Sequence, residues 1–155
     1  MDTDVRYYID QDKFNEMKRF EVHPGDLIMS CSGTIGKVAI IPDNVKRGVI
    51  NQALLKFTPK KDSITATYLK YLMESRSFLD AISENSGGSA IQNVASVKIL
   101  KTINVDIPSP TEQDYIVAQI DSANEKINTL RRQYSDKLHQ LLNLRRSLLA
   151  EAFAS

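Results

Sequence analysis

The chain has 155 residues, of which 42% are hydrophobic and 25% are charged, and its formal net charge is +1. This composition is typical of a soluble globular protein, and no apolar run approaches the roughly 18 residues of a membrane span. The charge balance gives no sign of a polybasic tail, and the single cysteine excludes an internal disulfide and fits a reducing compartment. We therefore expect a cytoplasmic protein with no membrane segment.

Charge is distributed unevenly along the chain. Residues 1–30 carry four bases and seven acids, a net charge of −3, whereas residues 31–110 carry ten bases and six acids, a net charge of +4. A basic middle segment is compatible with a surface that faces phosphate groups. The asymmetry is too modest to establish nucleic-acid binding by itself.

The first 58 residues predict short strands and one short helix. The helix is expected over residues 10–20, with Asp10 or Asp12 as its cap, and residues 23–26 have turn chemistry. Short apolar runs predict strands at residues 5–9, 27–30, 38–41 and 48–57, the last as one strand or as a pair. Together they predict an antiparallel β meander over residues 22–58.

Helical spacing of apolar residues begins after the predicted strands. Residues 65–83 are expected to form two helices that break near Ser75, with Thr65 or Thr67 as the cap. A glycine-containing loop over residues 85–89 and a short helix over residues 94–100 follow.

A strand and then the last helix are predicted after residue 102. Apolar and polar residues alternate over residues 103–107, which predicts a strand, and Pro108 and Pro110 end it and form a stiff joint. Thr111 is expected to cap the last helix, with Asp114 at its third position.

The last helix carries a long apolar stripe. Residues 111–155 contain neither glycine nor proline, and a continuous helix of this length would extend roughly 60 Å at 1.5 Å per residue. A helix that long cannot bury its stripe against its own small domain, so a partner-binding or self-associating coiled coil is favoured over a solvated helix of a helical hairpin. The predicted interface residues are Ile116, Ile120, Ile127, Leu130, Tyr134, Leu138, Leu141 and Leu148.

No residue pattern indicates catalysis, a metal site or a cofactor. The glycines of residues 32–37 lack the spacing and the Ser or Thr of a nucleotide-binding loop, so this segment is either a hairpin turn or a turn that presents Thr34 and Lys37 to phosphate. Cys31 is predicted to be a core cysteine, since neither histidine is near it in sequence. The amides at 51–52 and 92–93 either read adenine edges or satisfy turns and helix caps.

Five motifs in one order, within residues 21–153, resemble the DNA specificity subunit of type I restriction–modification systems. They cover residues 24–37, 51–54, 87–93, 107–113 and 144–149. The resemblance implies an α/β (α+β) target recognition domain over residues 1–108 and a long coiled-coil helix over residues 109–155. Because the family usually has more chain before Pro24, we expect the globular part to correspond to the C-terminal part of a recognition domain.

The resemblance also implies a function and partners. Family members recognise double-stranded DNA without catalytic activity, pack two such helices antiparallel, and assemble with DNA methyltransferase and restriction subunits. We therefore predict a homodimer or a pairing with a second half-subunit through the helix. Alternatively, the chain captures methyltransferase subunits without binding DNA. Predicted DNA-binding residues are Thr34, Lys37, Lys46, Arg47, Asn51, Gln92, Asn93 and Lys98, and charge reversal of Lys37 together with Arg47 is expected to weaken binding.

Overall fold

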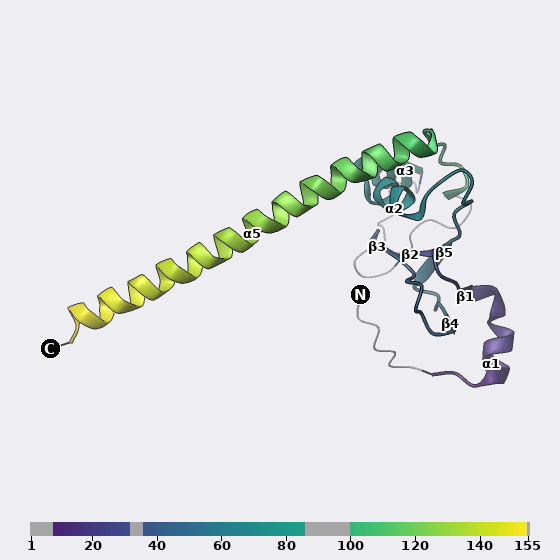
Figure 1. The fold of residues 1–155 in the computed structure, drawn as a ribbon. Coiled ribbons are helices and arrows are strands. Elements are labelled where there is room, and N and C mark those ends of the chain that lie inside the picture. The colour runs from purple at the N-terminus through teal and green to yellow at the C-terminus, as the bar shows by residue number, and fades with distance from the viewer. Residues whose placement is uncertain (1–7, 32–35, 86–99, 155) are drawn as a thin grey trace. The chain divides into compact units, whose positions relative to one another are not determined.

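The structure is a computed structural model that describes residues 8–31, 36–85 and 100–154. The chain divides into two compact units, residues 1–114 and residues 115–155. The elements of the first unit, up to the start of its last helix, are α1 (Gln11–Glu16), the 3-10 helix η1 (Lys18–Phe20), β1 (Glu21–Val22), β2 (Leu27–Ser30), β3 (Val38–Ile40), β4 (Gly48–Val49), β5 (Leu54–Phe57), α2 (Ala66–Glu74) and α3 (Arg76–Asn85). The last helix, α5 (Pro110–Ala152), is continuous and begins within the first unit (Figure 1).

Two small antiparallel sheets form the centre of the first unit. The larger one has the order β3-β2-β5, and the smaller one pairs β1 with β4. Leu27 of β2 lies opposite Ile40 of β3 and Phe57 of β5, so apolar side chains meet across both ladders. Residues 48–57 therefore form a pair of strands, and the two members of this pair belong to different sheets.

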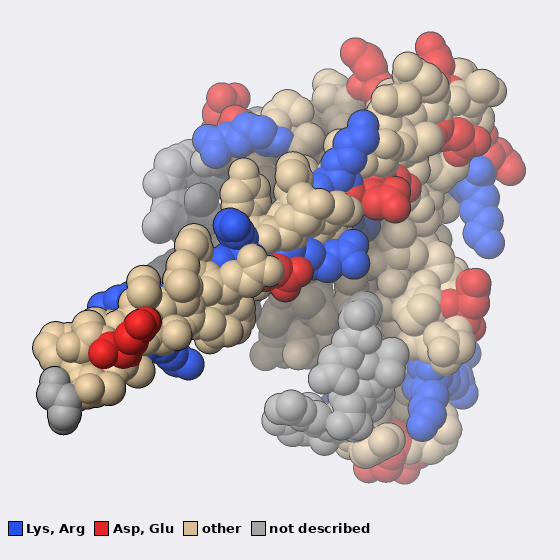
Figure 2. Space-filling model, turned by 60° about the vertical axis from the view of Figure 1, so that its left-hand side comes forward, with Lys and Arg blue, Asp and Glu red and all other residues tan. Residues whose placement is uncertain are grey.

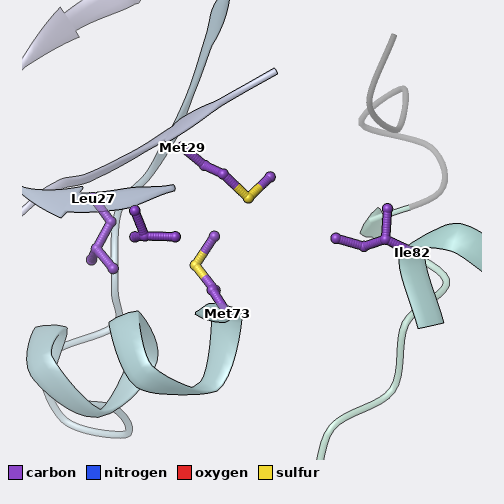
Figure 3. Packing of buried hydrophobic residues seen from close by; sticks show 5 residues of the cluster. Leu27, Met29, Met73 and Ile82 are labelled. Carbon is purple, nitrogen blue, oxygen red and sulfur yellow. The ribbon is translucent and has the colours of Figure 1, made fainter. Parts of the chain in front are cut away.

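The main core lies between the larger sheet and the two helices that follow it. Leu27 and Met29 alternate with more exposed residues along β2, and both are fully buried. Figure 3 shows their side chains beside Met73 of α2, with Ile82 of α3 in the same cluster. The period of two in the strand and the helical spacing in α2 thus direct their apolar side chains into one core.

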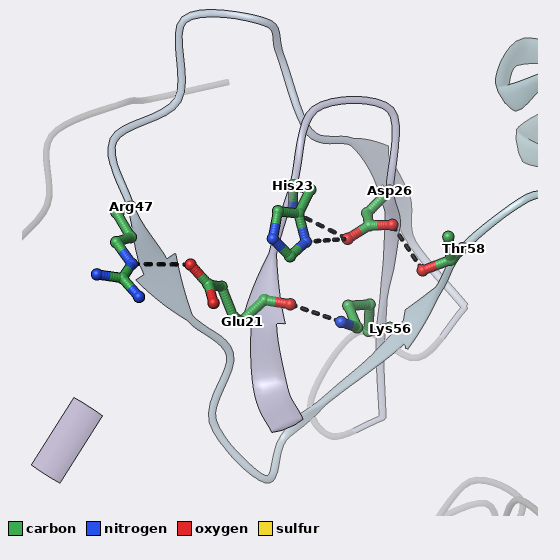
Figure 4. A network of polar contacts seen from close by, with 6 residues as sticks. All are labelled: Glu21, His23, Asp26, Arg47, Lys56 and Thr58. Atoms are coloured by element: carbon green, nitrogen blue, oxygen red, sulfur yellow. Dashed lines mark hydrogen bonds and ion pairs between the residues drawn. The ribbon is translucent and has the colours of Figure 1, made fainter. Parts of the chain in front are cut away.

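Asp26 is the buried polar residue of the turn before β2. One of its carboxylate oxygens accepts a hydrogen bond from the backbone N–H of His23 at 2.9 Å, and the other accepts one from the Thr58 hydroxyl at 2.7 Å (Figure 4). Gly25 adopts a φ of +83°, a conformation that glycine tolerates best. The predicted turn at residues 23–26 is confirmed, and its carboxylate also connects the turn to the segment after β5.

Most local predictions about the helices are confirmed. Asp10 caps α1, since its side chain accepts a hydrogen bond from the backbone N–H of Lys13 at 2.7 Å. Thr65 caps α2, and the predicted break between α2 and α3 lies at Ser75. Among the described residues, no helix has both the length and the apolar content that crossing a membrane requires.

Two predicted strands differ from the structure. Of residues 5–9, only Tyr8 and Ile9 are described, and neither is in a strand. The strand expected at residues 103–107 is wrong: Ile103 packs against the core, but Val105 and Ile107 are exposed, and none of the described strands pairs with this segment. Alternation alone does not make a strand, because a strand also needs a neighbouring strand with which it exchanges backbone hydrogen bonds. The predicted helix at 94–100 falls outside the described residues except for Leu100.

Candidate functional site

Four of the eight predicted DNA-binding residues lie in the described part of the chain. Lys37, Lys46, Arg47 and Asn51 are all exposed residues of the loops that connect the strands. Thr34, Gln92, Asn93 and Lys98 lie outside the described residues. Exposed polar side chains on loops can reach nucleic-acid phosphates, so the four described positions remain candidates for DNA binding.

Arg47 already has contacts within its own unit. Its Nε donates to the Glu21 carboxylate at 2.9 Å, and its guanidinium carbon lies 4.1 Å from the centre of the Phe14 ring (Figure 4 shows the pair with Glu21). The hydrogen bond from Arg47 lowers the pKa of Glu21. Because these contacts connect α1, β1 and the segment before β4, replacing Arg47 would change local packing as well as charge.

Asn51 and Lys37 have different surroundings. The side-chain oxygen of Asn51 accepts a hydrogen bond from the backbone N–H of Ala53 at 3.0 Å, so this amide satisfies a turn. The backbone N–H of Lys37 donates to the Ser30 hydroxyl at 3.3 Å, and the residue is exposed. Within the described residues, neither Lys37 nor Lys46 forms an ion pair, and both are therefore better placed than Arg47 to offer a full charge.

Charges of both signs are mixed on the described surface. Figure 2 shows Lys and Arg interspersed with Asp and Glu on the face in view. Several bases are neutralised by neighbours one helical turn away, including Lys70 by Glu74 and Arg76 by Asp80, at 3.0 and 2.9 Å. A broad uniform basic face is therefore absent from this view, and phosphate contacts would depend on individual loop lysines.

Cys31 has the properties of a structural cysteine. It is half-buried, its sulfur lies 3.7 Å from the carbonyl oxygen of Met29, and burial raises the pKa of its thiol. A raised pKa disfavours the thiolate that nucleophilic chemistry requires. Across residues 8–31, 36–85 and 100–154, no group of three or more His, Cys, Asp or Glu side chains could hold a metal ion.

The second unit exposes the predicted apolar stripe of α5 from Ile127 onward, whereas Ile116 and Ile120, which were also predicted for the interface, are half-buried. Five large apolar residues recur at intervals of seven, and the residues between 121 and 154 are all exposed in the single chain. The members of this series are Ile120, Ile127, Tyr134, Leu141 and Leu148. A repeat of seven sustained over four intervals is typical of a helix that packs along another helix.

The apolar face of α5 widens toward its C-terminal end. Leu142, Leu149 and Phe153 are exposed beside the main stripe, and the first two are again seven residues apart. These residues were absent from the predicted interface, although their own spacing was a signal for a second row. An apolar face this wide has room for more than one narrow coiled-coil seam.

The start of α5 lies two residues before the predicted position. The helix begins at Pro110, a favoured first residue because proline needs no N–H partner there. Ser109 precedes it, and its backbone N–H and hydroxyl donate to the Glu112 carboxylate at 2.9 and 2.7 Å, while the Glu112 N–H reaches the Ser109 hydroxyl at 3.4 Å. The prediction of Thr111 as cap was therefore wrong, because the capping box is formed by Ser109 and Glu112.

Glu112 makes the start of α5 sensitive to acid. Hydrogen bonds from the side chain and then the backbone of Ser109 lower the pKa of Glu112 below its ordinary value of 4.5. A lowered pKa in the folded state stabilises the fold above the ordinary pKa, and this contribution is lost as the pH falls through the lowered value. We expect Glu112→Gln to lower the melting temperature at pH 7 and to have less effect near pH 3.

The measurement is thermal unfolding of the parent and Glu112→Gln at several pH values, followed by circular dichroism. Glu125→Gln, which changes an exposed acid further along the same helix, is the matched control and should leave the melting temperature close to that of the parent throughout. A Glu112→Gln effect of equal size at pH 7 and pH 3 would contradict the role of the ionised carboxylate.

Gln113 is fully buried, with 0% of its surface exposed, although its side chain is polar. Its side-chain oxygen accepts a hydrogen bond from the backbone N–H of Thr65 at 2.9 Å. Its side-chain nitrogen donates to the carbonyl oxygens of Ser63 at 2.8 Å and Pro108 at 2.9 Å. One amide thus joins the first turn of α5 to the start of α2, across 48 to 50 residues of sequence.

Comparison with known proteins gives consistent relatives. The chain is 25% identical over 138 residues to the type I restriction enzyme EcoBI specificity subunit of Escherichia coli, covering 89% of this chain and 29% of that protein. It is 27% identical over 109 residues to the MjaIX specificity subunit of Methanocaldococcus jannaschii, covering 70% of this chain and 24% of that protein. The chain therefore spans less than a third of the length of these curated relatives.

Two solved structures share the fold. The HsdS subunit from Thermoanaerobacter tengcongensis has a TM-score of 0.68 at 16% identity, over 84% of this chain and 34% of that one. A chain from a structural study of assembly and conformational transition in the type I R-M system has a TM-score of 0.67 at 23% identity, over 86% and 31%. Both agree with the predicted combination of antiparallel sheets, short helices and one long helix.

The family model supplies the assignment. Residues 7–140, which include most of both units, match the model described as the type I restriction modification DNA specificity domain. The curated relatives are named specificity subunits, in line with the prediction that this subunit is not the enzymatic one. The chain belongs to the family of type I restriction–modification DNA specificity domains.

Proposed function

We propose that this chain is a non-catalytic DNA-recognition and assembly module of a type I restriction–modification complex. Its globular unit would contact double-stranded DNA through the exposed strand-connecting loops, and α5 would pair with the long helix of a second copy or of another half-subunit. Methyltransferase and restriction subunits would supply the catalysis. The observation that carries this proposal is the family match over residues 7–140, which includes both the loops and most of α5.

The exposed stripe of α5 supports the assembly part of the proposal. Apolar side chains recur at intervals of seven along α5, and the predicted interface residues Leu130, Leu138 and Leu141 are 50%, 58% and 53% exposed in the single chain. Large contiguous apolar surface of this kind is rare on monomers and is covered by a partner in stable proteins. A second copy of α5 offers a stripe of the same length and spacing.

Lys37 and Lys46 support the DNA-contacting part. Both are exposed, and neither is neutralised by an acid among the described residues, unlike Arg47, which is paired with Glu21 at 2.9 Å. A lysine in this situation can displace a condensed counterion from DNA. Each such contact increases, by about one, the steepness with which the logarithm of the affinity falls with the logarithm of the salt concentration. The two lysines therefore allow charge to be changed without breaking a contact of the fold.

The double substitution Lys37→Glu with Lys46→Glu is expected to weaken DNA binding at least tenfold and to lower the salt slope by about two. The measurement is fluorescence anisotropy with a labelled mixed-sequence duplex over a series of salt concentrations, with and without the methyltransferase subunit. Lys70→Glu with Arg76→Glu makes the same change of charge at positions already paired with acids, and should lower the salt slope less.

Two outcomes would count against this function. Equal affinity and equal salt slope for the two double variants would exclude the strand-connecting loops as the phosphate-facing surface. Binding of the methyltransferase subunit by a parent protein that shows no salt-dependent affinity for the duplex, alone or in the complex, would favour the alternative of a partner-capturing module that does not contact DNA.

A further inference from the structure

We infer that a β-bulge at Gly36 and Lys37 positions Lys37 for contact with a DNA phosphate, and that Gly36 and Ser30 are the positioning residues of this bulge. The inference deepens the proposed function and rests on it, because Lys37 is one of the two lysines that we propose to contact DNA. All of the contacts involved lie within the first unit of the chain.

Two residues before β3 lie opposite one residue of β2. The N–H of Gly36 donates to the carbonyl oxygen of Ser30 at 3.1 Å, and the N–H of Ser30 donates to the carbonyl oxygen of Lys37 at 3.0 Å. The regular register of β2 and β3 ends with Met29 opposite Val38, and Gly36 has a φ of +79°. A glycine with positive φ, at the first of two residues that share one partner, defines a G1 β-bulge.

Ser30 holds the backbone of Lys37 at two points. Its N–H donates to the Lys37 carbonyl oxygen, and its hydroxyl accepts the Lys37 N–H at 3.3 Å. Ser30 itself lies opposite Leu54 of β5, so it belongs to the central strand of the larger sheet. Because a bulge bends its strand and increases the local twist, it sets the direction in which the exposed Lys37 leaves the sheet.

Gly36 also lies against α3. The residue is buried, and a β-carbon at this position would lie 2.9 Å from the Cδ2 atom of Leu79. Carbon atoms in favourable contact are about 3.5–4.0 Å apart, so a larger residue would displace either Leu79 or the bulge. The helix α3 is anchored in the main core through Phe78 and Ile82. The bulge is therefore held from two sides, by β2 and by α3.

Three glycines of the first unit form a matched series for substitution by alanine. Gly36 combines a positive φ with the close approach of Leu79. Gly25 has a φ of +83°, but apart from its chain neighbours no atom lies within 4 Å of the place that a β-carbon would take. Gly48 of β4 has neither feature, because the nearest atom there is the carbonyl oxygen of Lys46 at an ordinary contact distance of 3.7 Å. The series separates a change at the bulge from backbone strain elsewhere and from the mere addition of a methyl group.

Fluorescence anisotropy of the full chain tests the inference, with a labelled mixed-sequence duplex, a series of salt concentrations and the methyltransferase subunit present. We expect Gly36→Ala to weaken binding roughly fivefold and to lower the salt slope by about one, as Lys37→Ala does, because both changes remove the same phosphate contact. The double variant should bind no more weakly than Lys37→Ala alone, since Gly36 acts through Lys37. Ser30→Ala should cause a smaller loss of affinity in the same direction, and Ser30→Thr, which keeps the hydroxyl, should bind as the parent does.

Gly25→Ala and Gly48→Ala are the controls and should keep the affinity and the salt slope of the parent. All variants are compared at a temperature at which circular dichroism shows each of them to be folded, because unfolding lowers the amount of active protein without changing the salt slope of the remainder. The parent salt slope in Gly36→Ala or in Lys37→Ala, additive losses in the double variant, or an equal loss in Gly25→Ala would overturn the inference and leave the proposed function standing. A parent without salt-dependent affinity for the duplex would refute the proposed function, and the inference with it.

Discussion

The double substitution Leu130→Asp with Leu141→Asp is expected to convert a self-associated parent protein to a monomer. Both leucines belong to the exposed stripe of α5, and fully burying one leucine contributes about 1.5–3 kcal/mol. In a symmetric pair each substitution occurs twice and places a charge in the apolar interface between the two helices. We therefore expect the dissociation constant to rise roughly a thousandfold or more, which corresponds to a loss of about 4 kcal/mol of association free energy.

Sedimentation equilibrium over a range of protein concentrations measures this change, and circular dichroism should report lower helix content because an unpaired amphipathic helix is less stable in water. The matched control is Thr129→Asp with Asn143→Asp, which adds the same two charges. At about 100° per residue these positions lie on the side of α5 opposite the stripe, so the control should associate as the parent does. A parent that remains monomeric at the highest concentration would refute self-association.

Gln113→Leu is expected to lower the free energy of unfolding of the first unit by roughly 3 kcal/mol. The substitution leaves the N–H of Thr65 and the carbonyl oxygens of Ser63 and Pro108 without their partner, and an unsatisfied buried polar group costs about 1–3 kcal/mol. Water can replace part of the lost hydrogen bonding, so we expect the total loss of stability to lie near the lower end of the summed costs of the three groups.

Urea unfolding of the parent and the Gln113→Leu variant, at one fixed protein concentration, measures the loss. The concentration must be held constant because any pairing through α5 adds to the apparent stability. Gln140→Leu is the control for the change of side chain, since Gln140 is exposed and lies on the same helix. A loss below about 0.5 kcal/mol, the usual range for surface substitutions, would show that the buried amide contributes little.

Elements governed by near neighbours in the chain could be predicted from the sequence. Asp10 and Thr65 were each one of two predicted candidates for a helix cap, and the break at Ser75 and the continuous last helix followed from the spacing of apolar residues. These features depend on hydrogen bonds and side-chain contacts three or four residues apart. The family was also recognisable from the order of five short motifs, and the match over residues 7–140 confirms it.

The tertiary structure decided where polar residues act. Gln113 was visible only as part of a motif, and its burial depends on Ser63 and Thr65, about 50 residues earlier in the chain. Arg47 was predicted as a DNA-binding residue, yet its Nε donates a hydrogen bond to the carboxylate of Glu21, 26 residues away in the sequence. A polar side chain looks the same in sequence whether it meets solvent, DNA or a distant backbone atom, because its partner is chosen by the path of the chain.

The sequence by itself thus determined the secondary structure of α1, α2, α3 and α5, the family, and the apolar stripe of α5 for which we propose a partner. Only the tertiary structure decided the order β3-β2-β5, the lack of a strand at residues 103–107, and the attachment of α5 through Gln113. The physical reason is range: periodicity and capping are set within one or two helical turns, whereas strand pairing and buried hydrogen bonds join segments that only folding brings together.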